Sequence, residues 1–302
     1  MQDAQETQGN KIAIIVVSWN VSDQLKQCLE SIDRYADVPC EVIVADNASV
    51  DESVAMLHSF SFTNNHVTNF TIFENKENIG FAKGCNQGIG VMDAEHALLL
   101  NPDARIREHT LSKSLEFIQE HSDAGVIGCK IEYEDGSKQG SAGSFPTLRG
   151  QLTRRLGWVK ESKKAKIFRA APARKWQEDV EMPVDHVKGA FFLITRRALN
   201  AIGELDGGFF LWFEETDYCL SVWQSGLKVY YTPSIAVTHV GGASFKKVSE
   251  WKKRMIWFRS IKRYFTKHYG LPTGIAIAIL DPICEVVGSV YRKIKYRKKS
   301  IQ

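Results

Sequence analysis

Between residues 11 and 121 the chain alternates continuous apolar runs with segments whose apolar positions recur at helical spacing. The continuous runs are KIAIIVVSW, CEVIVADNAS, FTIFEN and HALLLN. Such short runs are typical of strands covered on both faces, as in a parallel sheet. The helical segments are SDQLKQCLESIDRYA, with Ser22 placed as its N-cap, DESVAMLHSF, GFAKGCNQGIGVM and residues 108–121. This alternation predicts βαβ units and an α/β fold with a mainly parallel sheet.

The second half of the chain begins with a region of weak periodicity, residues 136–183, which we expect to form a variable surface lining an acceptor cleft. Periodicity returns in VDHVKGAFFLITRRAL, which predicts a strand followed by a helix. Another helix is predicted from about Glu214 to Gly226, because glycine suits a left-handed C-terminal residue. The segment KVYYTPSIAVTHVGG predicts a strand, a turn at Pro233 and a second strand.

The C-terminal region carries a different pattern. Its apolar positions at steps of three and four are Trp251, Met255, Phe258, Ile261 and Phe265. Lysines and arginines fill much of the remaining surface, so the pattern predicts a basic amphipathic helix. Such a helix either packs on the domain with a solvated charged face or lies on an anionic membrane.

The next stretch, LPTGIAIAILDPICEVVGSVY, is apolar over about the thickness of a bilayer. It is interrupted by Pro272, Asp281, Pro282 and Glu285. We therefore expect an interfacial hairpin or a monotopic insertion in place of a transmembrane span. The terminal YRKIKYRKKS would then lie among anionic lipid head groups.

Composition narrows the setting of the protein. The net charge is +4, and the basic excess lies in the last third of the chain, which indicates an anionic partner or surface. The six cysteines include no C-x-x-C pair and are expected to be buried thiols in a reducing compartment. Residues 1–10 are polar, are expected to be disordered and lack the pattern of a signal peptide, so we expect a cytoplasmic protein.

Polar residues follow each predicted strand of the first half. They are Ser18–Asn20, Asp46–Ser49, Asn75–Asn78 and Asn101–Asp103. Ligands of parallel sheets bind beyond the carboxyl ends of the strands, so these clusters predict a binding edge. Asp46 either caps its own turn through nearby N–H groups or accepts a hydrogen bond from a nucleobase imide.

Two further residues are candidates for a metal or phosphate site. Pro102 fixes the backbone before Asp103, whose carboxylate serves either turn chemistry or a divalent cation that also binds substrate phosphates. His239 follows an apolar run and precedes two glycines. It is either structural or a ligand at a site that a phosphate can approach closely.

The cluster Glu214, Glu215 and Asp217 opens a predicted helix. Acidic residues stabilise a helix N-terminus by about 0.3–1 kcal/mol each, which is a sufficient structural explanation. Crowded carboxyl groups beside the apolar FFLWF segment would also raise one another's pKa, which would supply a general base near neutral pH.

Seven motifs in order resemble the family 2 inverting glycosyltransferases, and most of all their bacterial rhamnosyltransferase-like branch. They are VVSWN, VADNASVD, ENIGFAKGCNQGI, LLLNPDA, GAFFLITRRAL, GGFFLWFEETDYCL and VTHVGG. The resemblance implies a GT-A fold with a Rossmann-like sheet over residues 11–245. It divides this domain into a nucleotide-sugar-binding half, 11–135, and an acceptor and catalytic half, 136–245. Residues 246–302 would form a membrane-associating, amphipathic helical appendage.

The resemblance also assigns roles to the matching positions. Asp46 matches the residue that reads the pyrimidine base, and Ser18, Asn20 and Ser49 would surround the nucleoside. Asn78 lies in the segment that shapes the nucleotide-sugar pocket.

Gly80 and Asn86 match the same pocket segment. Asp103 matches the last carboxylate of the D-x-D motif, which would bind Mg²⁺ or Mn²⁺ on the diphosphate, although Asn101 replaces the first acid. His239 matches a histidine that completes the metal or phosphate site.

Glu215 matches the catalytic base, which would take a proton from the acceptor hydroxyl. The family pattern has Asp where this chain has Glu215, so Glu214 and Asp217 remain alternatives for the base. Displacement in one step would invert the anomeric centre.

The expected function is transfer of rhamnose or a related deoxyhexose from a dTDP donor to a polyprenyl-diphosphate-linked acceptor of a cell-surface glycan such as O-antigen. We expect the enzyme on the cytoplasmic face of the plasma membrane, held by its basic C-terminal helix, with no nucleic acid partner. The alternatives are a hexosyltransferase that uses a UDP or GDP sugar, a sugar-1-phosphate nucleotidyltransferase and a non-catalytic membrane-associated module. The loop SWNVSDQ lacks the Gly-rich basic sequence of a nucleotidyltransferase.

Overall fold

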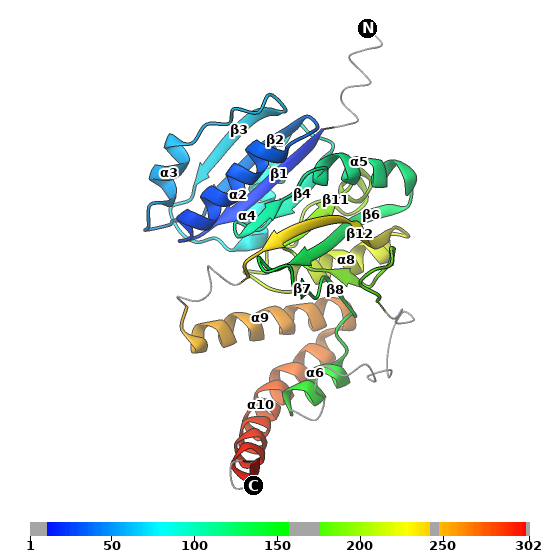
Figure 1. The fold of residues 1–302 in the computed structure, drawn as a ribbon. Coiled ribbons are helices and arrows are strands. Elements are labelled where there is room, and N and C mark those ends of the chain that lie inside the picture. Colours follow the sequence, from blue (N-terminus) through cyan, green and yellow to red (C-terminus); the bar gives the residue numbers. More distant parts are fainter. Residues whose placement is uncertain (1–10, 157–175, 242–247, 300–302) are drawn as a thin grey trace.

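The computed structural model describes residues 11–156, 176–241 and 248–299, with side chains described as far as residue 288. The predicted disorder of residues 1–10 and part of the predicted variable region therefore lie outside the described residues. The described chain forms an α/β body with a group of helices beside it (Figure 1).

A mixed, mostly parallel sheet forms the centre of the body, in the order β3-β2-β1-β4-β11-β6-β12-β5. The first four strands run parallel and are β1 (Ile12–Ser18), β2 (Cys40–Asp46), β3 (Val67–Glu74) and β4 (His96–Leu100). The others are β5 (Ala104–Ile106), β6 (Ala124–Glu132), β11 (Phe191–Ile194) and β12 (Lys228–His239). Strand β11 is antiparallel to both of its neighbours, β4 and β6.

Short strands extend this framework. Strands β7 (Lys138–Gln139) and β9 (Met182–Pro183) pair with β6 and β12. Strands β8 (Ala142–Gly143) and β10 (His186–Val187) form a separate antiparallel pair.

Helices cover both faces of the sheet, because the two sets of alternating strand residues are both apolar. Ile12, Ile14 and Val16 belong to the core under α2 (Ser22–Tyr35), α3 (Ser53–Ser59) and α5 (Thr110–Glu120). Ala13, Ile15 and Val17 belong to the core under α4 (Phe81–Val91), α7 (Arg196–Ile202) and α8 (Glu214–Gln224). The predicted alternation of strands and helices is confirmed in this half, but β3 is the edge strand and none of its residues is buried, so the prediction that it is covered on both faces was wrong.

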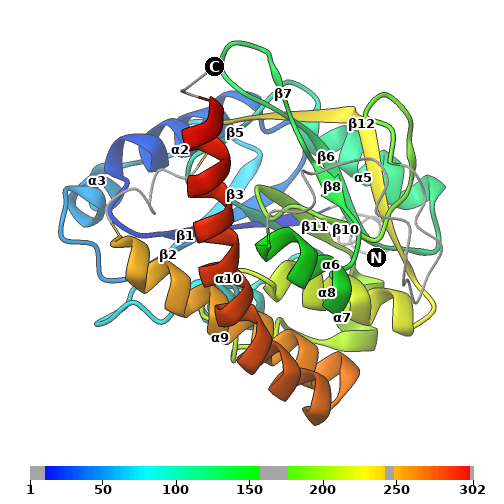
Figure 2. The same ribbon diagram turned by 90° about the horizontal axis from the view of Figure 1, so that it is seen from below.

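The remaining helices are α6 (Leu148–Arg155), α9 (Glu250–Tyr269) and α10 (Leu271–Lys299). They lie together below the sheet, and α10 leads away from the body to the C-terminus (Figures 1 and 2). A third core joins α9 and α10 to the segment before α8 through Phe209, Phe213, Ile261, Phe265 and Ile277.

Three other local predictions were wrong. Ser22 is not the N-cap of α2; Val21 holds that position, and the Ser22 N–H donates to Asp51 of another loop at 3.1 Å. Residues 228–239 form one strand, because a register shift between Thr232 and Ala236 accommodates the proline.

Of the two predicted forms of the C-terminal segment, the interfacial hairpin was wrong, since residues 271–299 form one helix that contains Pro282. The monotopic insertion stays a prediction. Its segment Leu271–Gly288 is long and apolar enough to cross a membrane by length and composition, and little of it is buried against the protein.

Candidate active site

Two loops at the carboxyl edge of the sheet are tied together through Ser49. Its N–H and hydroxyl donate to the two carboxylate oxygens of Asp46 at 2.8 and 2.6 Å, and its Oγ accepts from the Asn20 N–H at 2.8 Å. Asn20 has a left-handed backbone (φ 56°), and its Oδ1 accepts from the Val50 N–H at 2.7 Å. Ser18 is fully buried, and its hydroxyl has no partner among the described residues. The predicted nucleoside residues are thus adjacent, and Asp46 caps its own turn.

The next predicted group shapes the edge of this region through the backbone. Asn78 Oδ1 accepts from the Gly80 N–H at 3.0 Å, and Gly80 has a φ of 88°. A Cβ on Gly80 would lie 2.5 Å from the Phe210 carbonyl oxygen, so glycine is required there. The Asn86 side chain makes two hydrogen bonds to the Leu205 backbone. Its Oδ1 accepts from the Leu205 N–H at 3.1 Å, and its Nδ2 donates to the Leu205 carbonyl at 2.8 Å. Gly80 and Asn86 therefore hold the segment that leads to α8.

Pairing of β5 with β12 brings Asp103 beside His239, and the His239 Nε2 lies 3.2 Å from Asp103 Oδ1. Asp103 is buried, and its other oxygen accepts from the Gly241 N–H at 3.1 Å. Gln139 fixes the ring of His239: its amide nitrogen donates to the His239 carbonyl, so its Oε1 faces Nδ1 at 3.0 Å. The hydrogen-bond network therefore assigns the proton to Nδ1.

This arrangement fits a divalent cation. With Nδ1 protonated, the lone pair of Nε2 lies 3.4 Å from the Asn101 amide nitrogen, which can donate to it, and 3.2 Å from the Asp103 Oδ1 acceptor. A cation placed between Nε2 and Oδ1 would relieve the contact between these two acceptors. No group of three or more His, Cys, Asp or Glu side chains suited to a metal occurs among the described residues. The protein would therefore supply few ligands, and substrate phosphates and water would complete the shell, as is usual for Mg²⁺.

Glu214 and Glu215 form a carboxyl pair at the start of α8, in which Glu214 is buried and Glu215 is half-buried. Each has an Oε2 atom that is buried without a hydrogen-bond partner in the described structure. Burial raises the pKa of Glu214 well above its usual range, and the neighbouring Glu215 adds to the shift. Burial also raises the pKa of Glu215, while a hydrogen bond from Glu214 and the charge of Lys188 oppose that rise. Glu214 thus holds its proton more firmly, and Glu215 is the more acidic member.

The backbone before this pair is strained. Trp212 and Phe213 both have left-handed φ values, 65° and 75°. For residues other than glycine this costs roughly 1–2 kcal/mol each. Such strain is common at functional sites, where packing holds it in place.

A short backbone segment joins the carboxyl pair to the Asp103 region. The Ala190 carbonyl accepts from the Asn101 N–H at 3.2 Å. The adjacent Gly189 faces Glu215, because a Cβ added to it would lie 3.8 Å from Glu215 Oε1. Both candidate sites therefore border the same turn before β11.

Asp217 differs from the two glutamates before it. Its carboxylate oxygens pair with Lys267 Nζ and His268 Nε2 of α9, both at 2.7 Å. Asp217 is buried and holds α9 against α8.

Sequence reasoning missed Gln139, Lys267 and His268. Each lies some 50 to 100 positions from the residue that it contacts, and none belongs to a motif. Only the basic character of the α9 sequence hinted at the Asp217 contact.

Comparison with known proteins gives a consistent result. The model of the family described as Glycosyl transferase family 2 matches residues 13–199. Low-salt glycan biosynthesis hexosyltransferase Agl10 of Haloferax volcanii is 26% identical over 71% of this chain and 62% of its own length. An N-acetylglucosaminyl-diphospho-decaprenol L-rhamnosyltransferase of Mycobacterium tuberculosis is 24% identical over 76% of this chain and 75% of its own.

Among solved structures, the mannosyltransferase PcManGT of Pyrobaculum calidifontis, in complex with GDP-Man and Mn²⁺, is similar with a TM-score of 0.57. The match covers 92% of this chain and 73% of that chain at 16% identity, which supports a likeness of fold. The predicted resemblance to family 2 glycosyltransferases, including rhamnosyltransferases, is confirmed, and the fold is of the GT-A type.

Proposed function

Because this chain belongs to glycosyl transferase family 2, we propose that it moves a sugar from a nucleotide-sugar donor to a lipid-linked glycan acceptor, with inversion of the anomeric centre. One observation carries the proposal. Two groups border the same backbone turn of a family 2 fold. One is the Asp103 and His239 pair, which is suited to a cation, and the other is the carboxyl pair of Glu214 and Glu215, each with one oxygen that lacks a partner in the described structure.

The donor is proposed to be dTDP-rhamnose or a related dTDP-deoxyhexose, with a UDP or GDP hexose as the alternative. Support comes from the similarity to the mycobacterial rhamnosyltransferase. The nucleoside is assigned to the loops that hold Ser18, Asn20, Asp46 and Ser49. Since both Asp46 oxygens already accept hydrogen bonds from Ser49, a base would use their remaining lone pairs.

Asp103 and His239 would hold a Mg²⁺ or Mn²⁺ ion together with the donor diphosphate. When bound, such an ion stabilises the negative charge that develops on the leaving nucleoside diphosphate. Asn78 and Gly80, in the segment before α4, would shape the nucleotide-sugar pocket through their backbone. Asn86 acts indirectly, because its side chain is engaged with the Leu205 backbone.

Glu215 is assigned as the general base. It accepts the proton of the acceptor hydroxyl while that oxygen forms a bond to the anomeric carbon, and the bond from that carbon to the phosphate oxygen breaks. Glu214 keeps its proton and stabilises the charge on Glu215 by a hydrogen bond. Asp217 is not assigned this role, because both of its oxygens are paired with α9.

We also place the protein at an anionic membrane surface through α9 and α10. Leu271, Ile275, Ile279, Ile283 and Val286 repeat at helical spacing along α10 and are between 48% and 65% exposed. An exposed apolar stripe of this length is typical of an interaction surface. Basic residues follow it in the sequence, which suits acidic lipid head groups.

The test is a panel of nucleotide sugars incubated with the full chain, with and without Mg²⁺, Mn²⁺ or a chelator. We expect cation-dependent release of nucleoside diphosphate and thermal stabilisation by one donor class, with dTDP sugars first. NMR of the glycoside formed should show the inverted anomer. Absence of turnover and of stabilisation with every donor would overturn the proposal.

A further inference from the structure

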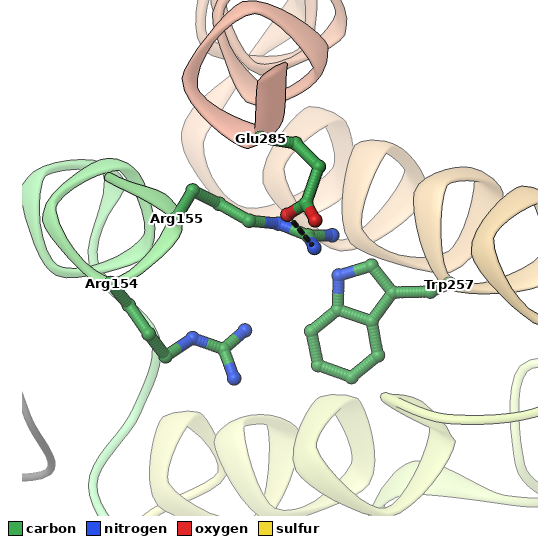
Figure 3. A pocket seen from close by; sticks show the side chains of 4 residues that line it. All are labelled: Arg154, Arg155, Trp257 and Glu285. Carbon is green, nitrogen blue, oxygen red and sulfur yellow. Dashed lines mark hydrogen bonds and ion pairs between the residues drawn. The ribbon is translucent and has the colours of Figure 1, made fainter. Parts of the chain in front are cut away.

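A cavity of about 300 Å³ lies among α6, α9 and α10, and Arg154, Arg155, Trp257 and Glu285 line it (Figure 3). It is separate from the Asp103 and His239 pair. Arg154 and Arg155 come from α6, Trp257 from α9 and Glu285 from α10.

Among the described residues around this cavity, guanidinium groups outnumber carboxylates. Arg155 is balanced by Asp281 and Glu285, at 3.0 and 2.8 Å. Arg254 also approaches Glu285, at 3.7 Å, so three guanidinium groups with Arg154 surround two carboxylates. A site of this charge favours an anionic ligand.

The remaining chemistry of the cavity points to a ligand rich in acceptors. The Arg154 guanidinium lies 5.1 Å from the centre of the Trp257 ring and donates to Gln151 Oε1 at 2.8 Å. Stacking and a fixed fork of donors are how arginine recognises phosphate groups. The Trp257 Nε1–H is buried without an acceptor among the described residues, and it can only donate.

Trp257 also connects the cavity to the candidate active site. Its ring centre lies 5.0 Å from that of Phe213 and 5.9 Å from that of Trp212. Phe213 directly precedes Glu214, so only the Trp257 and Phe213 rings separate a group bound in the cavity from the start of the carboxyl pair. An acceptor anchored here would have its sugar close to the proposed base.

The cavity also borders the exposed apolar stripe of α10. Glu285 is followed by Val286 and Val287, which are 65% and 49% exposed. Helical geometry places Ile279 and Val286 on one face and the buried Ile277 and Asp281 on the other, with Glu285 at the boundary. A molecule with an anionic head in the cavity could therefore lay a hydrocarbon chain along this stripe.

We propose that the cavity binds the phosphate group of the lipid-linked acceptor, and that the stripe on α10 contacts the lipid chain; the identity of this ligand as the acceptor rests on the proposed function. The same charge could attract the head group of any anionic phospholipid. The experiment separates these two sources.

The experiment is flotation of the full chain with three kinds of vesicle in the presence of a chelator. The chelator removes divalent cations and so prevents cation-dependent binding of diphosphate at the sheet edge. The vesicles are phosphatidylcholine alone, phosphatidylcholine with a polyprenyl diphosphate, and phosphatidylcholine with phosphatidylglycerol. The variant is Arg154→Gln, since Arg154 is exposed and its loss should leave the fold intact. The matched control is Arg149→Gln, an exposed arginine on the same helix outside the cavity.

We expect Arg154→Gln to weaken binding to the polyprenyl diphosphate vesicles by about tenfold or more, as for a charge-assisted hydrogen bond. Trp257→Phe should weaken it less, because it keeps the aromatic wall and removes one donor. Arg149→Gln should bind like the parent chain, and all variants should bind phosphatidylglycerol vesicles equally. Inorganic diphosphate should compete with the parent chain.

Two results would overturn the proposal. Equal binding of Arg154→Gln and Arg149→Gln to the diphosphate vesicles would show that the cavity holds no phosphate. An equal loss on phosphatidylglycerol vesicles would show a general lipid site. Turnover of nucleotide sugars by the parent chain is measured separately, so failure of the proposed function is recognised independently of the flotation result.

Discussion

The two acidic sites at the carboxyl edge of the sheet differ in how their polar atoms are satisfied. Asp103 receives a backbone N–H and faces a histidine whose ring is fixed by Gln139. Glu214 and Glu215 each keep an oxygen that is buried without a partner in the described structure. The first site is ordered before any ligand arrives, whereas the second bears an uncompensated cost of burial.

Asp217 shows that this difference does not follow from position alone. It lies on the same first turn of α8 and is as buried as Glu214, yet it is paired with Lys267 and His268. Buried carboxylate oxygens normally have a partner, so the Oε2 atoms of Glu214 and Glu215 are the exceptions that require an explanation. Proton transfer supplies one, because burial raises the pKa of both carboxyl groups above the ordinary glutamate value.

The largest expected effect comes from removing the proposed base. Glu215→Gln should lower kcat for sugar transfer about 10²–10⁴-fold, the usual contribution of general base catalysis. The matched control is Glu120→Gln, an exposed glutamate on α5 that should leave kcat unchanged. Unchanged far-UV circular dichroism would show that the fold is kept. Full activity in Glu215→Gln would move the base to another residue.

A large effect on stability, by contrast, is expected at the paired acid. Asp217→Asn removes the carboxylate that Lys267 and His268 contact, so the free energy of unfolding should fall by about 2–3 kcal/mol. Lys267 keeps its second partner, Asp206, at 3.2 Å. Lys267 is 39% exposed and can be resolvated, which keeps the loss at the lower end. Urea unfolding measures it. If Asp217→Asn lowered the free energy of unfolding less than Glu215→Gln does, the distinction between the ion-paired Asp217 and the glutamates would be contradicted.

A smaller effect should appear in the pH dependence of stability. The folded state binds the Glu214 proton more tightly than the unfolded state, because its pKa is raised. This contribution is complete below the unfolded pKa of about 4.3 and is lost as pH rises, by up to about 1.4 kcal/mol per pH unit. The stability of Glu214→Gln relative to the parent should therefore increase from pH 4 to pH 7. A difference that is constant with pH would show that Glu214 titrates normally.

The smallest effect is expected in the loop network of Ser49. Ser49→Ala removes the hydroxyl that links Asp46 to Asn20, which should cost about 1 kcal/mol of stability. The KM for the nucleotide sugar should rise less than about tenfold, with kcat unchanged. Thermal unfolding and steady-state kinetics measure the two effects, and a fall in kcat would place this loop in the chemical step.

Much of the fold was predictable from local patterns, and the exceptions have clear physical causes. Strands β1, β2 and β4 could be identified because each is a nearly continuous apolar run, and β3 because its second half is rich in Phe and Ile. Strand β6 was missed, since it begins with Ala124 and Gly125 and ends among charged residues. Strand β5 has only three residues, too few for any periodicity.

The candidate site was predictable as a set of residues but not as a geometry. The contact between Asp103 and His239 depends on the pairing of β5 with β12. Family motifs could suggest that both residues belong to one site, but no local sequence pattern could predict this strand pairing. The difference between Glu215 and Asp217 is set by α9, some 50 residues later. Tertiary pairing decides which of several similar acids is left unpaired.

The most direct test is the pH profile of kcat/KM for sugar transfer by the parent chain and by Glu215→Gln. We predict that the parent shows an acid limb above the ordinary glutamate pKa of about 4.3, and that this limb disappears with most of the activity in the variant. A profile that stays flat through that region, or an acid limb that persists in Glu215→Gln, would contradict the assignment of the unpaired carboxyl pair as the base.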